Sequence, residues 1–371
     1  MTSSHQKKID KLIKQMTLEE KLAQLGSYWA YELQTKGKFD SDKIAQKLAN
    51  GIGQITRIGG ASTLDPRAVA RTGNSIQKFL MENTRLRIPA ILHEESCSGA
   101  MILGGSVFPQ MIGLASSFQP DLVQTVADAI RKQMLAIGAR QALAPVLDVS
   151  ADPRWGRTEE TFGEDPTLVS HFGVAYIRGI QGNSLQDGVM ATGKHFIGHS
   201  LSQGGLNCGP VRVGMNELYN NFLGPFQAAV RDAGIAAMMN AYPEVDGEVV
   251  ASSKRILTDL LRHELGFDGL LVSDYDAIIM LHTFHKIAVD KSSAAVQAMV
   301  AGIDVELPTS ICYTDPLREA LLAGEIGIET IDQAVARHLQ KKFELGLFEN
   351  PYVNESRVIE LLDSKKQRVL A

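Results

Sequence analysis

The most constraining feature of this sequence is a regular alternation of two patterns from about residue 50 onward. Short apolar runs rich in Val, Ile, Met and Ala are each followed by a longer segment with the residue spacing of a helix. Most of these runs are almost continuously apolar, which is typical of parallel strands that helices cover on both faces of a sheet. We interpret as strands the segments 53–58, 89–94, 142–149, 189–196, 236–242, 270–276 and 302–307.

The segments between these runs are predicted to be helices, which gives a repeating βα architecture. Helical periodicity is clear in 120–138, 215–234, 253–266 and 290–302. Thr17 to Glu20 fits a capping box, which begins a further helix near the N-terminus. The seven predicted strands are one short of a closed barrel, and the connection 59–88 or 277–298 could contain the eighth. The pattern favours an α/β fold of the TIM-like (β/α)8 type, with a doubly wound open sheet as the alternative.

The barrel is predicted to span residues 1–345, and the remainder is predicted to be a tail. No internal repeat or low-complexity linker precedes residue 345. Residues 346–371 contain a turn and then an amphipathic helix that stops without an evident partner. We therefore expect this segment to be a linker helix toward a second domain that is absent from the sequence.

Charge, hydropathy and cysteine content argue against several classes of protein. The formal net charge is −5 and Lys and Arg are scattered among Asp and Glu, so no basic stripe predicts nucleic-acid binding. No stretch approaches the roughly 20 consecutive apolar residues that span a bilayer, so we predict no membrane contact. Cys97, Cys208 and Cys312 are too few for a disulfide framework and favour a cytoplasmic location, although a removed signal peptide would leave a secreted or periplasmic protein with the same pattern. His195 and His199 straddle a strand end and a glycine, so no metal site is predicted.

Nearly every predicted strand ends in a cluster of polar residues. The clusters are His93 to Glu95, Asp148 with the segment 152–157, Lys194-His195, Asn240 to Tyr242, Ser273 to Asp276, and Asp304 to Glu306. In a TIM barrel the C-terminal ends of the strands open on one face, where the reacting groups sit. Carboxylates and cations are buried together only when they pair, so this convergence predicts a preorganised polar site.

Four segments of the chain carry a recognisable set of motifs. They are Met16 to Leu25 (MTLEEKLAQL), Asp152 to Pro166 (DPRWGRTEETFGEDP), Lys194 to Phe196 (KHF) and Leu271 to Tyr275 (LVSDY). In this order the chain resembles glycoside hydrolase family 3, particularly its β-glucosidases and β-xylosidases, over about residues 8 to 350. The resemblance implies a β-glucosidase-like enzyme that retains configuration, needs no cofactor and acts on a small β-linked oligosaccharide or glycoside.

The resemblance also implies roles for individual residues. Asp274, in the Ser-Asp-aromatic element, would be the nucleophile that attacks the anomeric carbon and forms a covalent glycosyl-enzyme. Tyr242 matches an aromatic hydroxyl near the nucleophile. Tyr275 stands where the family often has Trp, which suggests a face on which the sugar stacks. Four charged residues match positions that hold sugar hydroxyls: Glu95, Arg157, Lys194 and His195.

Several of these residues also have a structural alternative. Asp274 could cap the helix that follows its strand. Arg157 could merely pair with Asp152 or Glu160, and Lys194 with Asp148. In that case these residues would stabilise the loops without contacting a ligand.

A retaining mechanism also needs a second carboxyl group as proton donor, and none of the motifs supplies one. Multidomain members of the family take this acid from a second α/β domain after the barrel. The single-domain β-N-acetylglucosaminidases take it from an Asp-x-His on the loop after the Lys-His strand, but the corresponding loop here, His199 to Cys208, contains no acid. We therefore expect a missing domain or a partner chain to supply the acid, whether the chain is a fragment or one subunit of a split enzyme. If the chain acts alone, Glu306, Asp276 and Glu244 are the first candidates.

Three other functions are compatible with the same pattern. One is a β-xylosidase of the same family, and another is a catalytically incomplete barrel that only binds sugar. The third is a phosphate-binding lyase or aldolase, because a barrel fold alone does not determine chemistry. Lys194 beside His195 is the single feature that suggests a lyase or aldolase.

Overall fold

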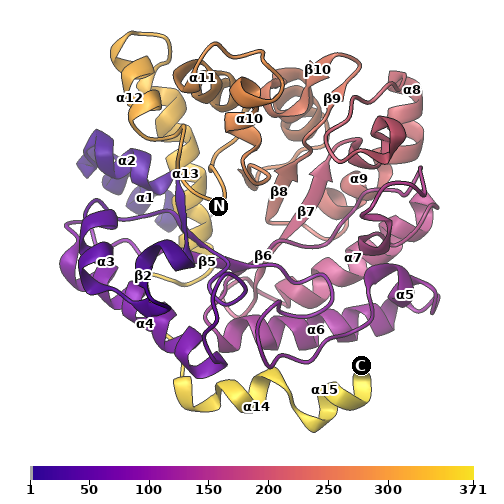
Figure 1. The fold of residues 1–371 in the computed structure, drawn as a ribbon, viewed down its shortest axis with the longest axis horizontal. Coiled ribbons are helices and arrows are strands. Elements are labelled where there is room, and N and C mark those ends of the chain that lie inside the picture. The colour runs from indigo at the N-terminus through magenta and orange to yellow at the C-terminus, as the bar shows by residue number, and fades with distance from the viewer. Residues whose placement is uncertain (1–2) are drawn as a thin grey trace.

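A computed structural model describes residues 3–371, and its centre is a curled parallel sheet surrounded by helices (Figure 1). Seven strands pair in the order β1-β4-β5-β6-β7-β8-β11, and neighbouring strands run parallel. They are β1 (Ser27–Trp29), β4 (Gln54–Thr56), β5 (Ile91–Glu94), β6 (Gln141–Ala142), β7 (Met190–Phe196), β8 (Ala237–Asn240) and β11 (Leu270–Val272). The predicted α/β class with a parallel sheet is therefore confirmed.

Within the seven-stranded sheet, the strand that the sequence pattern did not predict is β1, close to the N-terminus. It has only three residues, and Ser27, Tyr28 and Trp29 do not form an apolar run that periodicity could detect. The prediction of a strand within 59–88 or 277–298 is wrong, because both connections are largely helical. These helices are α4 (Pro66–Asn83), α10 (Ala277–Thr283) and α11 (Lys291–Ala301).

The predicted strand 302–307 makes a single parallel bridge, from Val305 to Val272 of β11. On its other side, the amide of Glu306 donates to the carbonyl of Leu25 at 2.8 Å, two residues before β1. This segment therefore lies between the last strand of the sheet and the start of the first.

The predicted strand 142–149 is interrupted early. β6 ends at Ala142, and one bridge from Val146 to Lys194 resumes the pairing with β7. Pro145 lies between them, and proline has no N–H to donate to a ladder. The polypeptide still follows β7, which brings Asp148 beside the C-terminal end of that strand.

The helices that cover the sheet begin where the sequence supplies capping residues. Thr17 accepts from the amide of Glu20 and the Glu20 side chain accepts in return, so the predicted capping box is confirmed. Asp65 and Asp165 cap helices that each begin with proline. Besides those given above, the α-helices are α1 (Ser3–Gln15), α2 (Leu18–Gln24), α3 (Ser41–Lys47), α5 (Met111–Ala115), α6 (Pro120–Ala136), α7 (Pro166–Gln181), α8 (Met215–Glu217), α9 (Gly224–Arg231), α12 (Asp315–Leu322) and α13 (Ile328–Glu344).

Two of the predicted helices depart from regular α geometry. The segment 215–234 forms α8, then a π-helical stretch over Leu218–Phe222, and then α9. Pro225 at the start of α9 has no N–H with which to continue the preceding helix. The segment 253–266 forms a π-helix over Arg255–Glu264. Single 3-10 turns cover Ala30–Leu33, Thr158–Glu160, His199–Leu201, Gln203–Gly205, Val250–Ser252 and Glu355–Arg357.

Two short antiparallel hairpins lie outside the main sheet. Their strands are β2 (Gln34–Thr35), β3 (Lys38–Phe39), β9 (Glu244–Val245) and β10 (Glu248–Val249).

The C-terminal segment contains α14 (Val358–Leu362) and α15 (Lys365–Leu370), and α14 packs on α4 and α6 (Figure 1). Val358 and Leu362 are buried in the same core as the barrel helices. The side chain of Gln133 on α6 donates to the carbonyl of Leu362 at 3.0 Å. The expectation that this segment stops without a partner is therefore wrong, because Val358 and Leu362 are buried against the outer helices.

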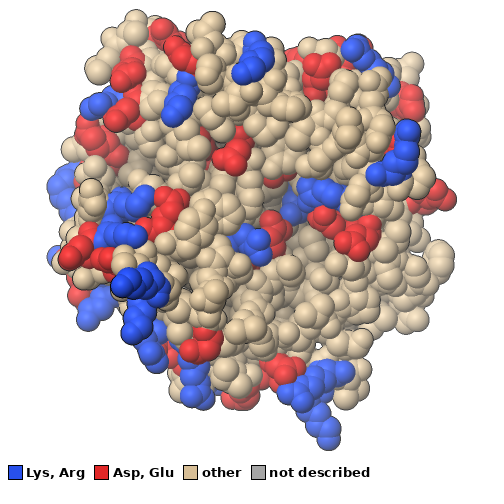
Figure 2. All heavy atoms as spheres, viewed as in Figure 1, with Lys and Arg blue, Asp and Glu red and all other residues tan. Residues whose placement is uncertain are grey.

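The face of the molecule seen in Figure 2 carries Lys and Arg mixed with Asp and Glu over its whole extent, with charges of both signs near its centre. This mixture agrees with the scattered charges of the sequence and provides no extended basic surface on that face. None of the helices in the described part of the chain is long and apolar enough to cross a membrane.

Candidate active site

Asp274 lies two residues after the end of β11 and is only 7% exposed. Its backbone amide donates to Oδ1 of Asn240 at the end of β8, at 3.2 Å. The amide of Tyr275 donates to Oδ1 of Asp274 at 2.7 Å. Oδ2 of Asp274 is buried and has no hydrogen-bond partner among residues 3–371. One carboxylate oxygen is therefore held by the backbone while the other is unengaged.

The protonation of Asp274 depends on opposing effects. Burial raises the pKa of the carboxyl group to about 6, while the charges of Arg157 and Lys194 lower it. The backbone amide of Tyr275, which donates to Oδ1, lowers the pKa further. Asp274 is thus ionised above about pH 6, in the form required of a nucleophile.

Lys194 and His195 form the C-terminal part of β7 and are almost completely buried. The Lys194 ammonium donates to Oε2 of Glu95 at 2.9 Å. Burial is the largest single effect and favours the neutral amine, but Glu95 together with Cys97 and Glu160 raises the pKa of Lys194. The alternative pairing of Lys194 with Asp148 is wrong, because Asp148 is bound to His195 instead.

His195 is held by Asp148, which lies at the end of the interrupted strand 142–149. Oδ2 of Asp148 lies 2.8 Å from both the backbone nitrogen and the ring Nδ1 of His195. The other ring nitrogen, Nε2, lies 3.6 Å from Oδ2 of Asp274. His199 packs edge-on against His195, with ring centroids 4.4 Å apart.

Arg157 follows the Asp-Pro-Arg-Trp-Gly element and forms two hydrogen bonds to Glu160, at 2.6 and 2.8 Å. The pairing with Glu160 considered above is therefore present. It does not remove Arg157 from the site, because the charge of Arg157 is the largest of the effects that lower the pKa of Asp274. The same ion pair lowers the pKa of Glu160.

Aromatic residues form one side of the site. The ring of Tyr275 meets that of Trp29 edge-on, with centroids 5.2 Å apart, and Trp29 in turn stacks on Tyr31. The hydroxyl of Tyr242 donates to the carbonyl of Tyr275 at 2.9 Å. Trp29 was missed in the sequence because it belongs to the unpredicted strand β1. The close spacing of the aromatic residues Trp29 and Tyr31 was the signal that could have pointed to this side of the site.

The polar cluster predicted at Asp304 and Glu306 does not join the site. Asp304 is buried between Arg262 and Arg337, each at 2.7 Å, and also accepts from the amide of Leu271. The carboxylate of Glu306 accepts the backbone amides of three residues, and burial raises its pKa to about 7. These three residues are Ile311, Cys312 and Tyr313. The prediction for this cluster is wrong, because Asp304 binds two arginines of the outer helices and the backbone of β11, and Glu306 binds the backbone of the loop that follows it.

Asp148, His195 and His199 are close enough to be compared with a metal site, since their ligand atoms lie within 4.8 Å of one another. However, Oδ2 of Asp148 already accepts from the backbone of His195, and Nε2 of His199 lies 2.9 Å from the carbonyl oxygen of Asn207. Hydrogen bonds within the protein thus account for part of the ligand set that a metal would need.

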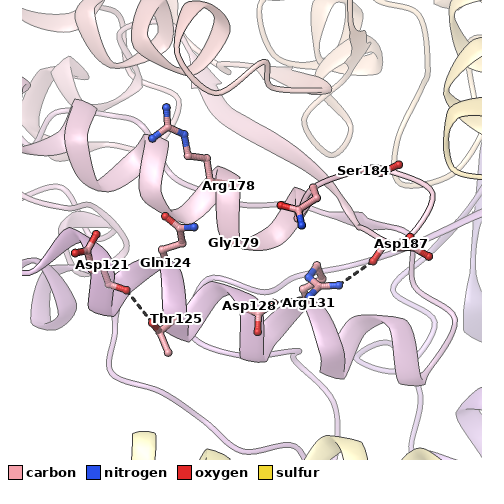
Figure 3. Close-up of a pocket in the computed structure, with 11 residues that line it drawn as sticks. Asp121, Gln124, Thr125, Asp128, Arg131, Arg178, Gly179, Ser184 and Asp187 are labelled. Atoms are coloured by element: carbon pink, nitrogen blue, oxygen red, sulfur yellow. Dashed lines mark hydrogen bonds and ion pairs between the residues drawn. The ribbon is translucent and has the colours of Figure 1, made fainter.

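A groove of about 610 Å³ lies between α6 and α7, away from Asp274 (Figure 3). Its lining mixes acidic and basic residues that engage one another or the backbone. Arg131 contacts Asp128 and the carbonyl of Asp187, and Arg178 donates to the carbonyl of Asp232. The groove lacks the convergent unpartnered atoms found around Asp274.

Comparison with known proteins agrees with this arrangement. A β-xylosidase of Formosa agariphila is 34% identical over 332 residues, which cover 85% of this chain and 44% of that protein. A periplasmic β-glucosidase of Salmonella typhimurium is 34% identical over 343 residues, which cover 92% and 42% respectively. The solved structure of a β-glucosidase from Erythrobacter marinus superposes with a TM-score of 0.92 at 31% identity, covering 99% of this chain and 48% of that one. The chain thus spans about half the length of these relatives.

The model of the glycosyl hydrolase family 3 N-terminal domain matches residues 17–340. This range contains all seven strands of the sheet and every residue of the site around Asp274. By fold, motifs and family match, the chain belongs to glycosyl hydrolase family 3 and carries its N-terminal domain.

Proposed function

We propose that this chain is the catalytic barrel of a retaining β-glycosidase that hydrolyses terminal, non-reducing β-D-glycosidic bonds. The observation that carries the proposal is the unengaged Oδ2 of Asp274, buried near the charges of Arg157 and Lys194. Similarity to β-glucosidases and β-xylosidases of the same family supports it. A small β-linked oligosaccharide or glycoside is the substrate that fits this chemistry.

In this reaction Asp274 attacks the anomeric carbon as the bond to the leaving oxygen breaks, and the leaving oxygen takes a proton from an acid. Water then attacks the same carbon, loses its proton to the conjugate base of that acid and releases Asp274 as a carboxylate. Arg157, Lys194, His195 and Glu95 hold sugar hydroxyls, since each presents a charged or polar group beside Asp274. Tyr242 orients the nucleophile, and Tyr275 provides an aromatic surface for the sugar ring.

The architecture that presents these residues would be a closed (β/α)8 barrel. The segment 302–307 would take the eighth position, and its contacts with Val272 on one side and Leu25 on the other support this assignment. The barrel would occupy residues 1–345, and residues 346–371 would connect it to a second domain.

The proton donor would come from that second domain or from a partner chain. Three carboxylates of the site are already engaged: Glu95 by Lys194, Glu160 by Arg157 and Asp148 by His195. The greater length of the relatives also supports a donor outside the barrel.

Two alternatives keep the same site. A β-xylosidase is favoured by the similarity to the enzyme of Formosa agariphila, and a barrel that binds sugar without turnover would result if no donor ever joins it. The three cysteines are free thiols, which supports a cytoplasmic location for either form.

The proposal can be tested by proton NMR of the reaction with an aryl β-glucoside whose phenol is strongly acidic, with azide as the acceptor because it needs no deprotonation. Retention predicts the β-glucosyl azide, which does not mutarotate. Formation of the α-glucosyl azide would contradict the proposal, and a parallel reaction with the β-xyloside would decide between the two sugars.

A further inference from the structure

The side chain of Asp148 is nearly inaccessible and is devoted to one partner, His195. Asp148 is 3% exposed, and its Oδ2 lies 2.8 Å from the backbone nitrogen of His195 and 2.8 Å from ring Nδ1. The backbone N–H can only donate, so Oδ2 is an acceptor in this contact. A single oxygen therefore fixes both the main chain and the ring of His195.

This contact decides which ring nitrogen of His195 carries the proton. Burial raises the pKa of Asp148 to about 7, so above that pH the group is a carboxylate that can only accept. Nδ1 must then be the N–H donor. Burial and the charge of Arg157 lower the pKa of His195 well below its usual value, so the ring stays neutral and Nε2 presents a lone pair.

That lone pair faces a second acceptor. Nε2 of His195 and Oδ2 of Asp274 lie 3.6 Å apart, and both are buried without a hydrogen-bond partner among residues 3–371. Two buried acceptors without a donor are unfavourable, and a hydroxyl group placed against them could donate to either one. His199, packed edge-on against the ring at 4.4 Å, restricts its rotation.

This acceptor complements the cationic donors of the site. Lys194 and Arg157 can only donate hydrogen bonds, so they bind the oxygen atoms of sugar hydroxyls. A bound sugar also has O–H protons to donate. Nε2 of His195 is the neutral acceptor that lies beside the nucleophile.

We propose that Asp148 is a positioning residue that holds His195 as a hydrogen-bond acceptor, so that one hydroxyl of the bound sugar donates to the pair formed by His195 Nε2 and Asp274 Oδ2. This inference rests on the proposed function, because it requires a sugar at Asp274. It adds that the site selects glycosides that carry this hydroxyl and discriminates against the analogue that lacks it.

The tautomer can be measured directly by NMR of the chain labelled with ¹⁵N-histidine at pH 8, with the signals of His195 assigned by their loss in His195→Gln. We expect a protonated Nδ1 and an unprotonated Nε2. In Asp148→Ala the oxygen that accepts from Nδ1 is lost, so the ring is no longer held in this tautomer and a proton should appear on Nε2. A proton on Nε2 in the unaltered chain would overturn the proposal.

The hydroxyl can be identified by calorimetry with glucose and its monodeoxy analogues. For the unaltered chain we expect one analogue to bind about 10-fold to 100-fold more weakly than glucose because of this hydrogen bond. In Asp148→Ala, glucose should bind as weakly as that analogue, whereas the penalties at the other positions should persist. Asp121→Ala, which removes a carboxylate from an exposed position on α6, should behave like the unaltered chain.

Equal penalties in the unaltered chain and in Asp148→Ala would overturn this inference while leaving the proposed function intact. No binding of glucose or xylose to the unaltered chain would instead contradict the proposed function, and with it the hydroxyl that this inference assigns.

Discussion

The ammonium group of Lys194 donates to Oε2 of Glu95 at 2.9 Å, which joins the end of β7 to the residue that follows β5. Two further side chains of the site are also held by a hydrogen bond to a carboxylate: Arg157 by Glu160, and His195 by Asp148. Each cation or ring thus has a fixed orientation before a ligand arrives. Such preorganisation lets a polar site bind without a large cost of rearrangement.

Replacing a sugar-binding residue should weaken binding without unfolding the chain. Arg157→Ala, Lys194→Ala and His195→Ala should each reduce the affinity for a monosaccharide or an iminosugar by about 2 kcal/mol or more, because a charged or buried hydrogen bond is lost. Calorimetry would measure the loss. Arg154→Ala is the matched control, since Arg154 lies on the same loop but is exposed and pairs with Asp152. Unchanged binding in all three variants would place the sugar site elsewhere.

The rate of glycosylation should fall as the pH decreases through the pKa of Asp274, which is about 6. The carboxylate is the reactive form, so activity toward an aryl glycoside with an acidic phenol is present above this pH and lost below it. Arg157→Ala removes the cation that most lowers this pKa, so the acid limb of the pH profile should move to higher pH.

Arg157→Lys keeps the positive charge and should move the limb less than Arg157→Ala does. A limb that stays in place, or moves to lower pH, in Arg157→Ala would show that another group controls the profile.

Asp304 should matter for stability and not for sugar binding. Asp304→Asn leaves Arg262 and Arg337 without their buried partner, which should cost about 3–5 kcal/mol of unfolding free energy. Asp232→Asn breaks an exposed pair with Arg231 and should leave the free energy of unfolding almost unchanged. Urea denaturation and calorimetry with glucose would separate the two roles. If folded Asp304→Asn bound sugar more weakly, Asp304 would have to contribute to the sugar site.

If the proton donor lies outside the 371 residues, the chain alone should cleave disaccharides very slowly, because general acid catalysis is worth typically 10²–10⁴-fold. Aryl glycosides with acidic phenols need little protonation and should still react with Asp274. Azide needs no deprotonation, so it should accelerate the second step and yield a β-glycosyl azide. Efficient hydrolysis of a disaccharide by this chain would mean that one of its own carboxyl groups is the acid.

The parallel α/β architecture could be predicted because continuous apolar runs report burial on both faces of a sheet. β1 could not, since its three residues interact mainly through tertiary pairing with β4 and carry little local pattern. The early end of β6 could have been read from Pro145, whose missing N–H breaks a ladder. The docking of α14 depends on contacts with α4 and α6, which are far from it in sequence.

The residues of the site were found from polar positions at strand ends, and Lys194, His195 and Asp274 are indeed close together. The same rule failed for Asp304 and Glu306, because a strand end does not reveal whether a carboxylate faces the barrel mouth or its own loop. The pairing of Asp148 with His195, and not with Lys194, depends on the backbone path after Pro145. Residue types alone could not distinguish the two partners.

The most direct test of the account is to incubate the chain with a 2-deoxy-2-fluoroglycosyl fluoride and to locate the adduct by peptide mass spectrometry. Fluoride leaves without an external acid, so the first step should proceed even when the proton donor is absent. We expect one 2-fluoroglycosyl group on Asp274, within the peptide that contains Leu270 to Asp276, and no adduct in Asp274→Asn. An adduct on any other residue, or none on the unaltered chain, would contradict the assignment of Asp274 as the nucleophile.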